Sequence, residues 1–145
     1  MRRHRFVLLA GLVVAVVALV ACGGDDDDAT GNAGDPLADT EWVLAADALD
    51  VAVPDTSVPT ASFADGTMSG SNGCNNYSAG YTAVDGSLEL TAVATTFMAC
   101  PPDQTAVETA FNAALGEAVG YELADDTLTL TNAAGDAVLV FDPAG

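Results

Sequence analysis

Basic side chains are confined to the first five residues of this 145-residue sequence, and this limits most what the rest of the chain can build. Arg2, Arg3, His4 and Arg5 are the only residues of their kinds, against 21 acidic residues and a net charge of −18. From residue 6 onward, no salt bridge between side chains can form. A fold must therefore be held by apolar packing, hydrogen bonds or bonds between cysteines, while its acids repel one another.

The N-terminal segment has the organisation of an export signal. After the basic residues, Phe6 to Ala21 is a run of apolar residues and Gly11. As a helix, these sixteen residues reach about 24 Å, short of the ~30 Å hydrocarbon core of a bilayer. Acidic rather than basic residues follow the run, whereas a membrane anchor is longer and is followed by basic residues. We interpret residues 1–21 as a signal peptide.

The end of the apolar run resembles a bacterial lipobox, in which small and aliphatic residues precede a cysteine. The matching residues are Leu19-Val20-Ala21-Cys22. This resemblance implies cleavage before Cys22 and attachment of diacylglycerol to its thiol. The protein is then lipid-anchored to the bacterial cell membrane or envelope, with its domain on the extracytoplasmic side. The alternative is an ordinary signal peptide followed by an unrelated cysteine.

Residues 22–39 have the composition of a tether. They include Gly23-Gly24, the acidic run Asp25 to Asp28, and Pro36. Few apolar residues are present, so we expect a lipidated Cys22 and a disordered acidic linker before a domain at residues 40–145. Four adjacent acids in a flexible chain lack the fixed geometry of a metal site, and no metal is expected there.

Turn-forming pairs divide the remaining sequence into short strands. Asp65-Gly66 and Asp85-Gly86 favour type I′ turns, in which both central residues have positive φ. Asp125-Asp126 separates a further pair of strands, and Gly135-Asp136 precedes a last apolar run. The expected strands are 41–44, 61–64, 67–69, 81–84, 87–90, 121–123, 127–131 and 137–141.

One segment has a helical period instead. From Asp103 to about Gly116, apolar residues recur on one helical face that continues to Ala118. The prolines at 101 and 102 suit the first turn of a helix. The fold class is therefore mostly β (α+β). We expect a small twisted antiparallel sheet or barrel-like domain of about eight strands, with one helix before the last three.

Two cysteine-containing segments lie in the expected domain, Gly73-Cys74-Asn75 and Met98-Ala99-Cys100. With the residues around them, they resemble the META/HslJ-like domain of bacterial lipoproteins over about residues 41–141. The other matching residues are Trp42, Leu44, Phe63, Gly66, Gly70, Tyr77, Tyr81, Thr96, Glu108, Phe111, Leu115, Leu128 and Leu130.

The resemblance implies a compact, mostly-β fold with one helix on an envelope-associated protein. It also implies a link to heat shock or antibiotic tolerance, and no enzymatic activity defines the family. This chain departs from the family in having no basic residue in the domain. A family role that depends on a positive surface therefore does not transfer to it.

The residues themselves leave three states open for Cys74 and Cys100. An exported chain meets an oxidising environment, and an even pair after lipidation favours a disulfide. Two buried free thiols are the second possibility. A reactive Cys74 is the third, but a nucleophilic thiol needs a base or a cation nearby, and the domain has neither His, Lys nor Arg.

Several polar and aromatic residues allow a structural or a ligand-binding role. Asn72, Asn75 and Asn76 could bind a ligand, although asparagine also tolerates the left-handed backbone of tight turns, which we favour. Four aromatic residues form a second group. They could line a ligand slot, but we expect most of them to pack in the core. This group is Trp42, Tyr77, Tyr81 and Phe97.

Composition narrows the functions open to the chain. The domain lacks the residues for a Ser-His-Asp triad or a histidine-bound metal, and no catalytic residue, metal or cofactor is expected. Without cations it should not bind nucleic acid. We expect a structural or stress-related envelope protein that contacts the membrane through its lipid. We also expect a protein partner, for which a basic envelope or secreted protein is a candidate. The alternative is an inhibitor or binding module for a secreted hydrolase, a protease or a lysozyme.

Overall fold

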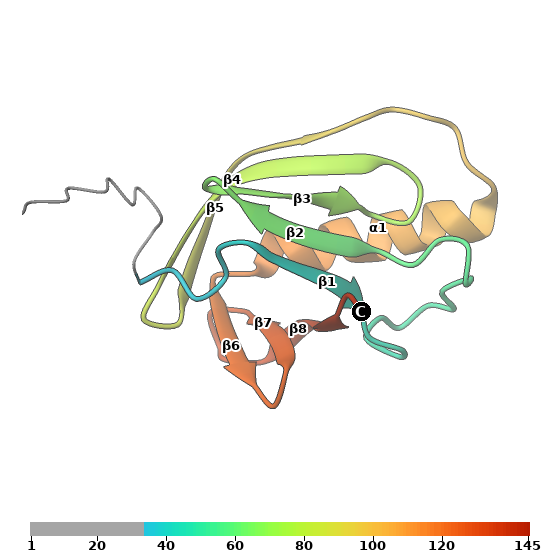
Figure 1. The fold of residues 1–145 in the computed structure, drawn as a ribbon. Coiled ribbons are helices and arrows are strands. Elements are labelled where there is room, and N and C mark those ends of the chain that lie inside the picture. Colours follow the sequence, from blue (N-terminus) through green and yellow to red (C-terminus); the bar gives the residue numbers. More distant parts are fainter. Residues whose placement is uncertain (1–33) are drawn as a thin grey trace, which may run out of the picture.

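The computed structural model describes residues 34–145. The predicted signal peptide, Cys22 and the tether up to residue 33 lie outside the described residues. Nine elements follow from residue 40 onward (Figure 1). They are β1 (Thr40–Leu44), β2 (Thr60–Ala64), β3 (Thr67–Ser71), β4 (Asn76–Val84), β5 (Ser87–Thr95), α1 (Pro102–Glu117), β6 (Gly120–Ala124), β7 (Thr127–Thr131) and β8 (Ala137–Pro143).

The strands form one closed antiparallel barrel. Each strand pairs with the next along the chain, and β1 also pairs with β8. The tight turns have the backbone expected of them: φ is +49° at Asp65 and Asp85, and +71° and +82° at the glycines that follow. The expectation of a mostly-β, barrel-like domain of about eight strands with one helix is confirmed.

Helix α1 supplies much of the barrel's filling. Val107, Phe111 and Leu115 are buried at successive turns of its apolar face. The ring of Phe111 lies 5.3 Å from that of Tyr77 in β4 and 6.4 Å from that of Phe141 in β8. The helix therefore joins two strands on different sides of the barrel, and each aromatic contact adds to the energy of area burial.

The inward-facing residues of the strands complete one core. Alternate positions of β4 and β7 are buried, as a half-buried strand requires. Fully buried side chains besides those of α1 come from β2, β3, β7 and β8. They include Phe63, Met68, Leu128, Leu130, Leu139 and Phe141.

The ordered domain begins before residue 40, where the sequence placed its start. Leu37 is fully buried and belongs to the core. The Leu37 N–H donates to a carboxylate oxygen of Asp35 at 2.9 Å, and the other oxygen accepts the hydroxyl hydrogen of Tyr81 at 2.7 Å. The composition of residues 22–39 indicated too little apolar surface to pack. One leucine and one carboxylate suffice to fix residues 35–39 to the barrel.

Strand β5 is the least enclosed part of the barrel. It pairs with β4 along its length but with β6 at a single position, Ser87 opposite Gly120. Every residue from Thr91 to Ala99 is exposed. Figure 1 shows the chain beyond β5 crossing above β4 and descending to the start of α1.

Candidate functional site

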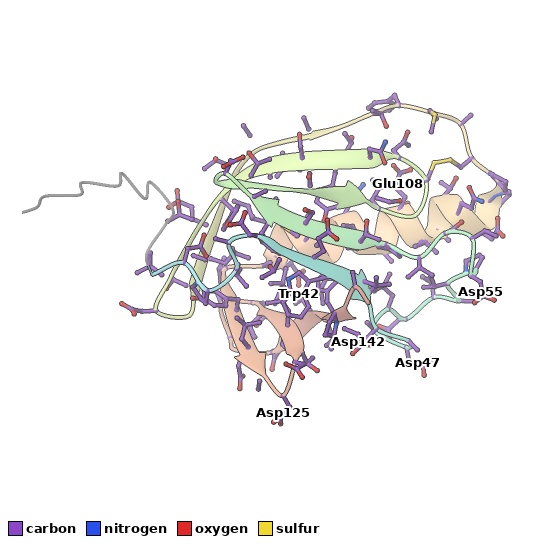
Figure 2. The ribbon with its side chains drawn as sticks, viewed as in Figure 1. Trp42, Asp47, Asp55, Glu108, Asp125 and Asp142 are labelled. Carbon is purple, nitrogen blue, oxygen red and sulfur yellow. A yellow bond between two sulfur atoms is a disulfide. The ribbon has the colours of Figure 1, made fainter. Side chains whose placement is uncertain are left out.

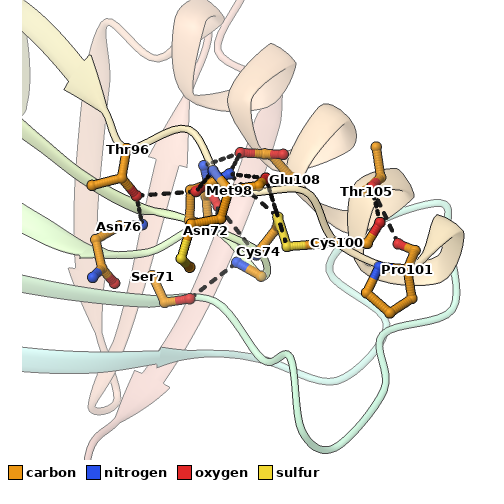
Figure 3. The surroundings of a disulfide bond; sticks show 12 residues. Ser71, Asn72, Cys74, Asn76, Thr96, Met98, Cys100, Pro101, Thr105 and Glu108 are labelled. Carbon is orange, nitrogen blue, oxygen red and sulfur yellow. Dashed lines mark hydrogen bonds between the residues drawn. A yellow bond between two sulfur atoms is a disulfide. The ribbon is translucent and has the colours of Figure 1, made fainter.

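The two cysteine-containing segments meet at the N-terminal half of α1. A disulfide joins Cys74, in the turn between β3 and β4, to Cys100, two residues before the helix. Their Cα atoms are 6.0 Å apart, within the usual range for a disulfide. Figure 3 shows Glu108 of α1 beside this bond, with Asn72 and Met98 close to it. Three segments far apart in sequence thus form one cluster.

Glycine is needed at position 73 for this cluster to form. Its φ is +101°, and an added Cβ would lie 2.5 Å from Cγ1 of Val107 in α1. Both the backbone conformation and the close approach to the helix exclude a larger residue without rearrangement. The glycine of the Gly-Cys-Asn segment therefore sets how closely the turn sits on α1.

Asn72 and Asn75 are buried and use their amides to hold the turn and the helix together. The side-chain oxygen of Asn72 accepts the N–H of Asn75 at 2.7 Å and that of Cys74 at 3.2 Å. Both side-chain amide groups donate to the same Glu108 oxygen, at 3.1 Å from Asn72 and 2.9 Å from Asn75. Hydrogen bonds to a charged acceptor are stronger than neutral ones, at about 1.5–3 kcal/mol net.

Asn75 also fixes the exposed segment before Cys100. Its side-chain oxygen accepts the Met98 N–H at 2.7 Å, and its NH₂ group donates to the Met98 carbonyl at 3.3 Å. The hydroxyl of Thr96 donates to the same side-chain oxygen at 3.0 Å. One side-chain amide therefore bonds both the N–H and the carbonyl of Met98, as the backbone of a neighbouring strand would. The turn interpretation of Asn72 holds, and Asn75 has this further structural role.

The side chains of residues 96–98, the segment held by Asn75, face solvent. Phe97 is 99% exposed and Met98 is 61% exposed. The expectation of core packing is met by Trp42, Tyr77 and Tyr81, and it is wrong for Phe97. The backbone of residues 96–98 is held against the Asn75 amide, which leaves the Phe97 side chain directed outward. Beside it, a hollow of about 580 Å³ lies between this segment and α1 and includes Glu108.

Two buried tyrosines of β4 have altered acidity. Burial raises the pKa of Tyr77 above its ordinary value of 10.0, and its hydroxyl donates to the Thr60 carbonyl at 2.8 Å. Burial also raises the pKa of Tyr81, and the hydrogen bond and negative charge of Asp35, with the charge of Asp39, add to the effect. Both hydroxyls act as neutral hydrogen-bond donors.

The sequence alone did not assign a role to Glu108 or to Asp35. Glu108 is only one of the residues that match the family pattern, and its hydrogen-bond partners lie 33 and 36 residues earlier in the chain. Asp35 was placed in the tether. The sequence signal for its role is Leu37, an apolar residue two positions after a carboxylate that can accept its N–H in an Asx turn.

The arrangement is suited to holding segments together rather than to activating a nucleophile. Within residues 34–145, both cysteines are bonded to each other and no group of three or more potential metal ligands is close enough to hold an ion. In the same part of the chain, no helix combines the length and the apolar character that spanning a membrane requires. Cys22, the predicted lipidation site, lies outside the described residues.

The fold and the cluster define a class: single-domain antiparallel barrels with one inserted helix and a disulfide linking the β3–β4 turn to the helix start. The model of the META domain family matches residues 35–145. The chain belongs to the META domain family.

Solved structures agree with this assignment. An NMR structure of a protein from Burkholderia xenovorans is 30% identical, with a TM-score of 0.60 over 74% of this chain and 83% of that one. A second NMR structure is 26% identical, with a TM-score of 0.54 over 72% of this chain and 89% of that one. No curated protein matches the chain.

Proposed function

We propose that this chain is an exported, lipid-anchored envelope protein whose META domain acts by binding another molecule rather than by catalysing a reaction. The observation that carries the proposal is the state of its most reactive groups. Cys74 and Cys100 are bonded to each other, and Glu108 accepts two amide hydrogen bonds. No basic residue follows position 5 to activate a nucleophile or stabilise an anionic intermediate.

The surface supports a binding role. Acidic side chains are spread over the molecule: Asp47, Asp55 and Asp125 project from loops and turns, and Asp142 lies near the C-terminus (Figure 2). Glu108 lies apart from these four in the same view. A surface with one sign of charge favours basic partners and speeds their association at low ionic strength.

Cross-linking in the native envelope tests the binding role directly. The full chain, produced in its own host and cross-linked before extraction, should form a discrete adduct with a basic protein, identified by mass spectrometry. A variant with Cys22→Ser should lose the adduct if the partner lies at the membrane. A chain that forms no adduct under conditions that cross-link other envelope proteins would contradict the proposal.

The lipid anchor has its own test. Mass spectrometry of membrane-extracted protein should find an acylated N-terminal peptide that starts at Cys22. Two or more acyl chains give stable anchoring, at about 0.8 kcal/mol per buried CH₂. The Cys22→Ser variant should leave the membrane fraction, and a variant that stays acylated and membrane-bound would overturn the assignment of Cys22.

The stress role rests on the family resemblance. A strain that lacks the protein should survive heat or envelope-directed antibiotics less well than its parent. Complementation with the wild-type chain should restore survival, whereas the Cys22→Ser variant should not. Equal survival of all strains under both stresses would remove this part of the proposal.

A second candidate function is inhibition of a secreted hydrolase. All charged side chains of the domain are acidic, which favours a basic enzyme as target, and the exposed Phe97 offers an apolar contact. Lysozyme activity should then fall in the presence of the full chain, and salt should relieve the inhibition by screening. An acidic hydrolase of similar size serves as the control and should be unaffected.

A further inference from the structure

The barrel is closed between β5 and β6 at one end of β5 only. Strand β5 (Ser87–Thr95) pairs with β4 from end to end apart from a register shift at Ala92 and Val93, yet with β6 it shares a single pair, Ser87 with Gly120. Two backbone bonds flank this pair, from the Leu88 N–H to the Val119 carbonyl at 3.0 Å and from the Tyr121 N–H to the Gly86 carbonyl at 2.8 Å. Beyond Leu88, the described part of the chain places no strand beside β5. We call residues 90–95 the β5 edge.

At both ends of the β5 edge, at Leu90 and Thr95, backbone groups point away from β4. The Leu88 N–H is directed away from β4, and Leu90, two residues later, directs its backbone groups to the same side. At the other end, Thr96 donates to the Asn76 carbonyl on the β4 side. The backbone N–H and carbonyl of the preceding residue, Thr95, therefore point away from β4. The edge offers hydrogen-bonding groups at both ends of a stretch of about 20 Å.

Two hollows border this edge, one at each end. The larger, of about 580 Å³, lies between residues 95–100 and the middle of α1. The smaller, of about 280 Å³, lies between residues 88–93 and the C-terminal end of α1. Residue numbers rise along β5 as they fall along α1, so the hollows follow one another along a single furrow. Only about one helical turn, from Asn112 to Leu115, separates them.

The furrow combines apolar surface with a carboxylate in each hollow. Val93 is 54% exposed, and Phe97 and Met98 are more so. Glu89 lines the smaller hollow and Glu108 the larger. Natural proteins protect a free edge with lysine, proline or a bulge. Residues 88–99 contain no lysine or proline, and the register shift at Ala92 and Val93 interrupts only the middle of the edge.

We propose that the β5 edge binds an extended, basic segment of another protein as an added strand. Backbone hydrogen bonds would join the segment to β5. Its apolar side chains would contact Val93, Phe97 and Met98, and its cationic side chains would lie near Glu89 and Glu108. The inference rests on the proposed binding function and names the surface and the partner chemistry.

Charge selects this occupant over a second copy of the chain. A paired copy would bring another Glu89 and Glu108 to the same furrow, with no basic residue beyond position 5 to balance them. Like charges across an interface are costly, whereas lysine or arginine in an added strand relieves the local excess of negative charge. The recognition mode is strand addition, in which main-chain bonds give affinity and side-chain pockets give specificity.

The test uses the full chain in detergent and a capped octapeptide of alternating Lys and Val. Peptide binding should slow hydrogen exchange at the Leu90 and Thr95 amides and leave the buried amides of β7 unchanged. Two matched peptides are N-methylated at every Lys or at every Val, so each keeps one hydrogen-bonding edge. One should bind, and the other should lose at least about tenfold in affinity.

Charge variants of the protein give a second readout. Glu89→Gln and Glu108→Gln should each weaken peptide binding severalfold at low salt, and the difference should shrink at high salt. In Glu108→Gln the side-chain carbonyl oxygen can still accept the two asparagine amides, so this variant should stay folded. Asp125→Asn, in a turn outside the furrow, is the matched control and should bind like the wild type.

Several outcomes overturn the inference. They are equal binding of both N-methylated peptides, equal binding of a Glu-Val octapeptide, a dimer of the chain that protects the β5 edge, and slow exchange at Leu90 and Thr95 without peptide. Absence of peptide binding also overturns it. The proposed function is judged separately, because an envelope adduct cross-linked away from the β5 edge would sustain that function while this inference falls.

Discussion

Strands β4 and β5 are neighbours of equal length, and they differ in almost every other respect. β4 has a partner strand on each side and alternates between buried and exposed residues from end to end. β5 alternates over its first half, and all its residues from Thr91 onward are exposed. A shared hairpin therefore does not give two strands the same environment. The second neighbour decides whether a strand has an inner face.

The two strands also differ in how the chain holds them. β4 is fixed by core packing through Tyr77 and Tyr81, and by the hydrogen bonds of their hydroxyls. The end of β5 leads into a segment fixed by the Asn75 amide and the disulfide. Apolar burial stabilises the first and polar and covalent links stabilise the second. Substitutions should separate these two mechanisms.

The largest difference is expected between Tyr77→Ala in β4 and Val93→Ala in β5. Tyr77 is buried against Phe111, and truncating it leaves a cavity that should cost about 3–5 kcal/mol of unfolding free energy. Val93 is half exposed, and its truncation should change stability by less than about 0.5 kcal/mol. Urea unfolding of both variants measures the two losses of unfolding free energy. Equal losses would contradict the prediction.

Removing the disulfide should have the next largest effect. The bond closes a loop between residues 26 apart, and the chain-entropy model assigns it about 3–4 kcal/mol. The variant with both Cys74→Ser and Cys100→Ser should lose this stability and should gain fast hydrogen exchange first at residues 96–100. If exchange instead rises equally in β4, the bond supports the whole barrel rather than the end of β5.

Alkaline pH should weaken β4 specifically. Both tyrosine pKa values are raised in the folded state, so below pH 10 both hydroxyls stay protonated in the folded and unfolded chain and do not make stability depend on pH. Above pH 10 the unfolded chain loses tyrosine protons that the native chain retains. Stability should then fall by about 1.4 kcal/mol per pH unit for each tyrosine.

Phenylalanine substitutions check this pH dependence. Tyr77→Phe should cost about 1 kcal/mol at neutral pH through loss of the bond to Thr60. It should also flatten the alkaline decline, and adding Tyr81→Phe should flatten it further. Thermal melts at pH 8 to pH 11 give the slopes, and unchanged slopes in the double variant would assign the decline to other groups.

The smallest expected effect is a gain of stability in β5. Ala92 has φ of +50°, and a register shift interrupts the pairing between β4 and β5 there. The left-handed conformation costs alanine about 1–2 kcal/mol. Glycine avoids this cost, but its greater conformational freedom in the unfolded chain offsets part of the gain. Ala92→Gly should stabilise by about 0.5–1 kcal/mol in thermal melts, and a loss would show that the methyl group makes a needed contact.

Local chemistry explains which features the sequence could predict. The Asp-Gly turns need positive φ at two adjacent residues, and only a few residue pairs supply it, so the hairpins were recognisable from the sequence. The apolar face of α1 was also recognisable, because its residues recur with the local period of a helix. The start of the domain was placed too late because Leu37 packs through distant contacts that composition does not reveal.

Phe97 and Glu108 depended on pairing that no local pattern contains. An aromatic residue in the run from Thr96 to Met98 predicts burial, yet the Asn75 amide holds the backbone of this run so that the Phe97 side chain faces solvent. Glu108 was one acid among many until the turn at residues 72–75 was placed against α1. In both cases the deciding contact joins residues that are distant along the chain.

The pairing of β1 with β8 has a consequence for the order of folding. All other strand pairs join consecutive strands, so most hairpins can form as soon as their residues are available. The last strand, Ala137–Pro143, closes the barrel against the first, Thr40–Leu44, and this contact spans nearly the whole domain. Closing so long a loop costs entropy before any contact offsets it. The barrel therefore cannot be completed before β8 is available to pair with β1.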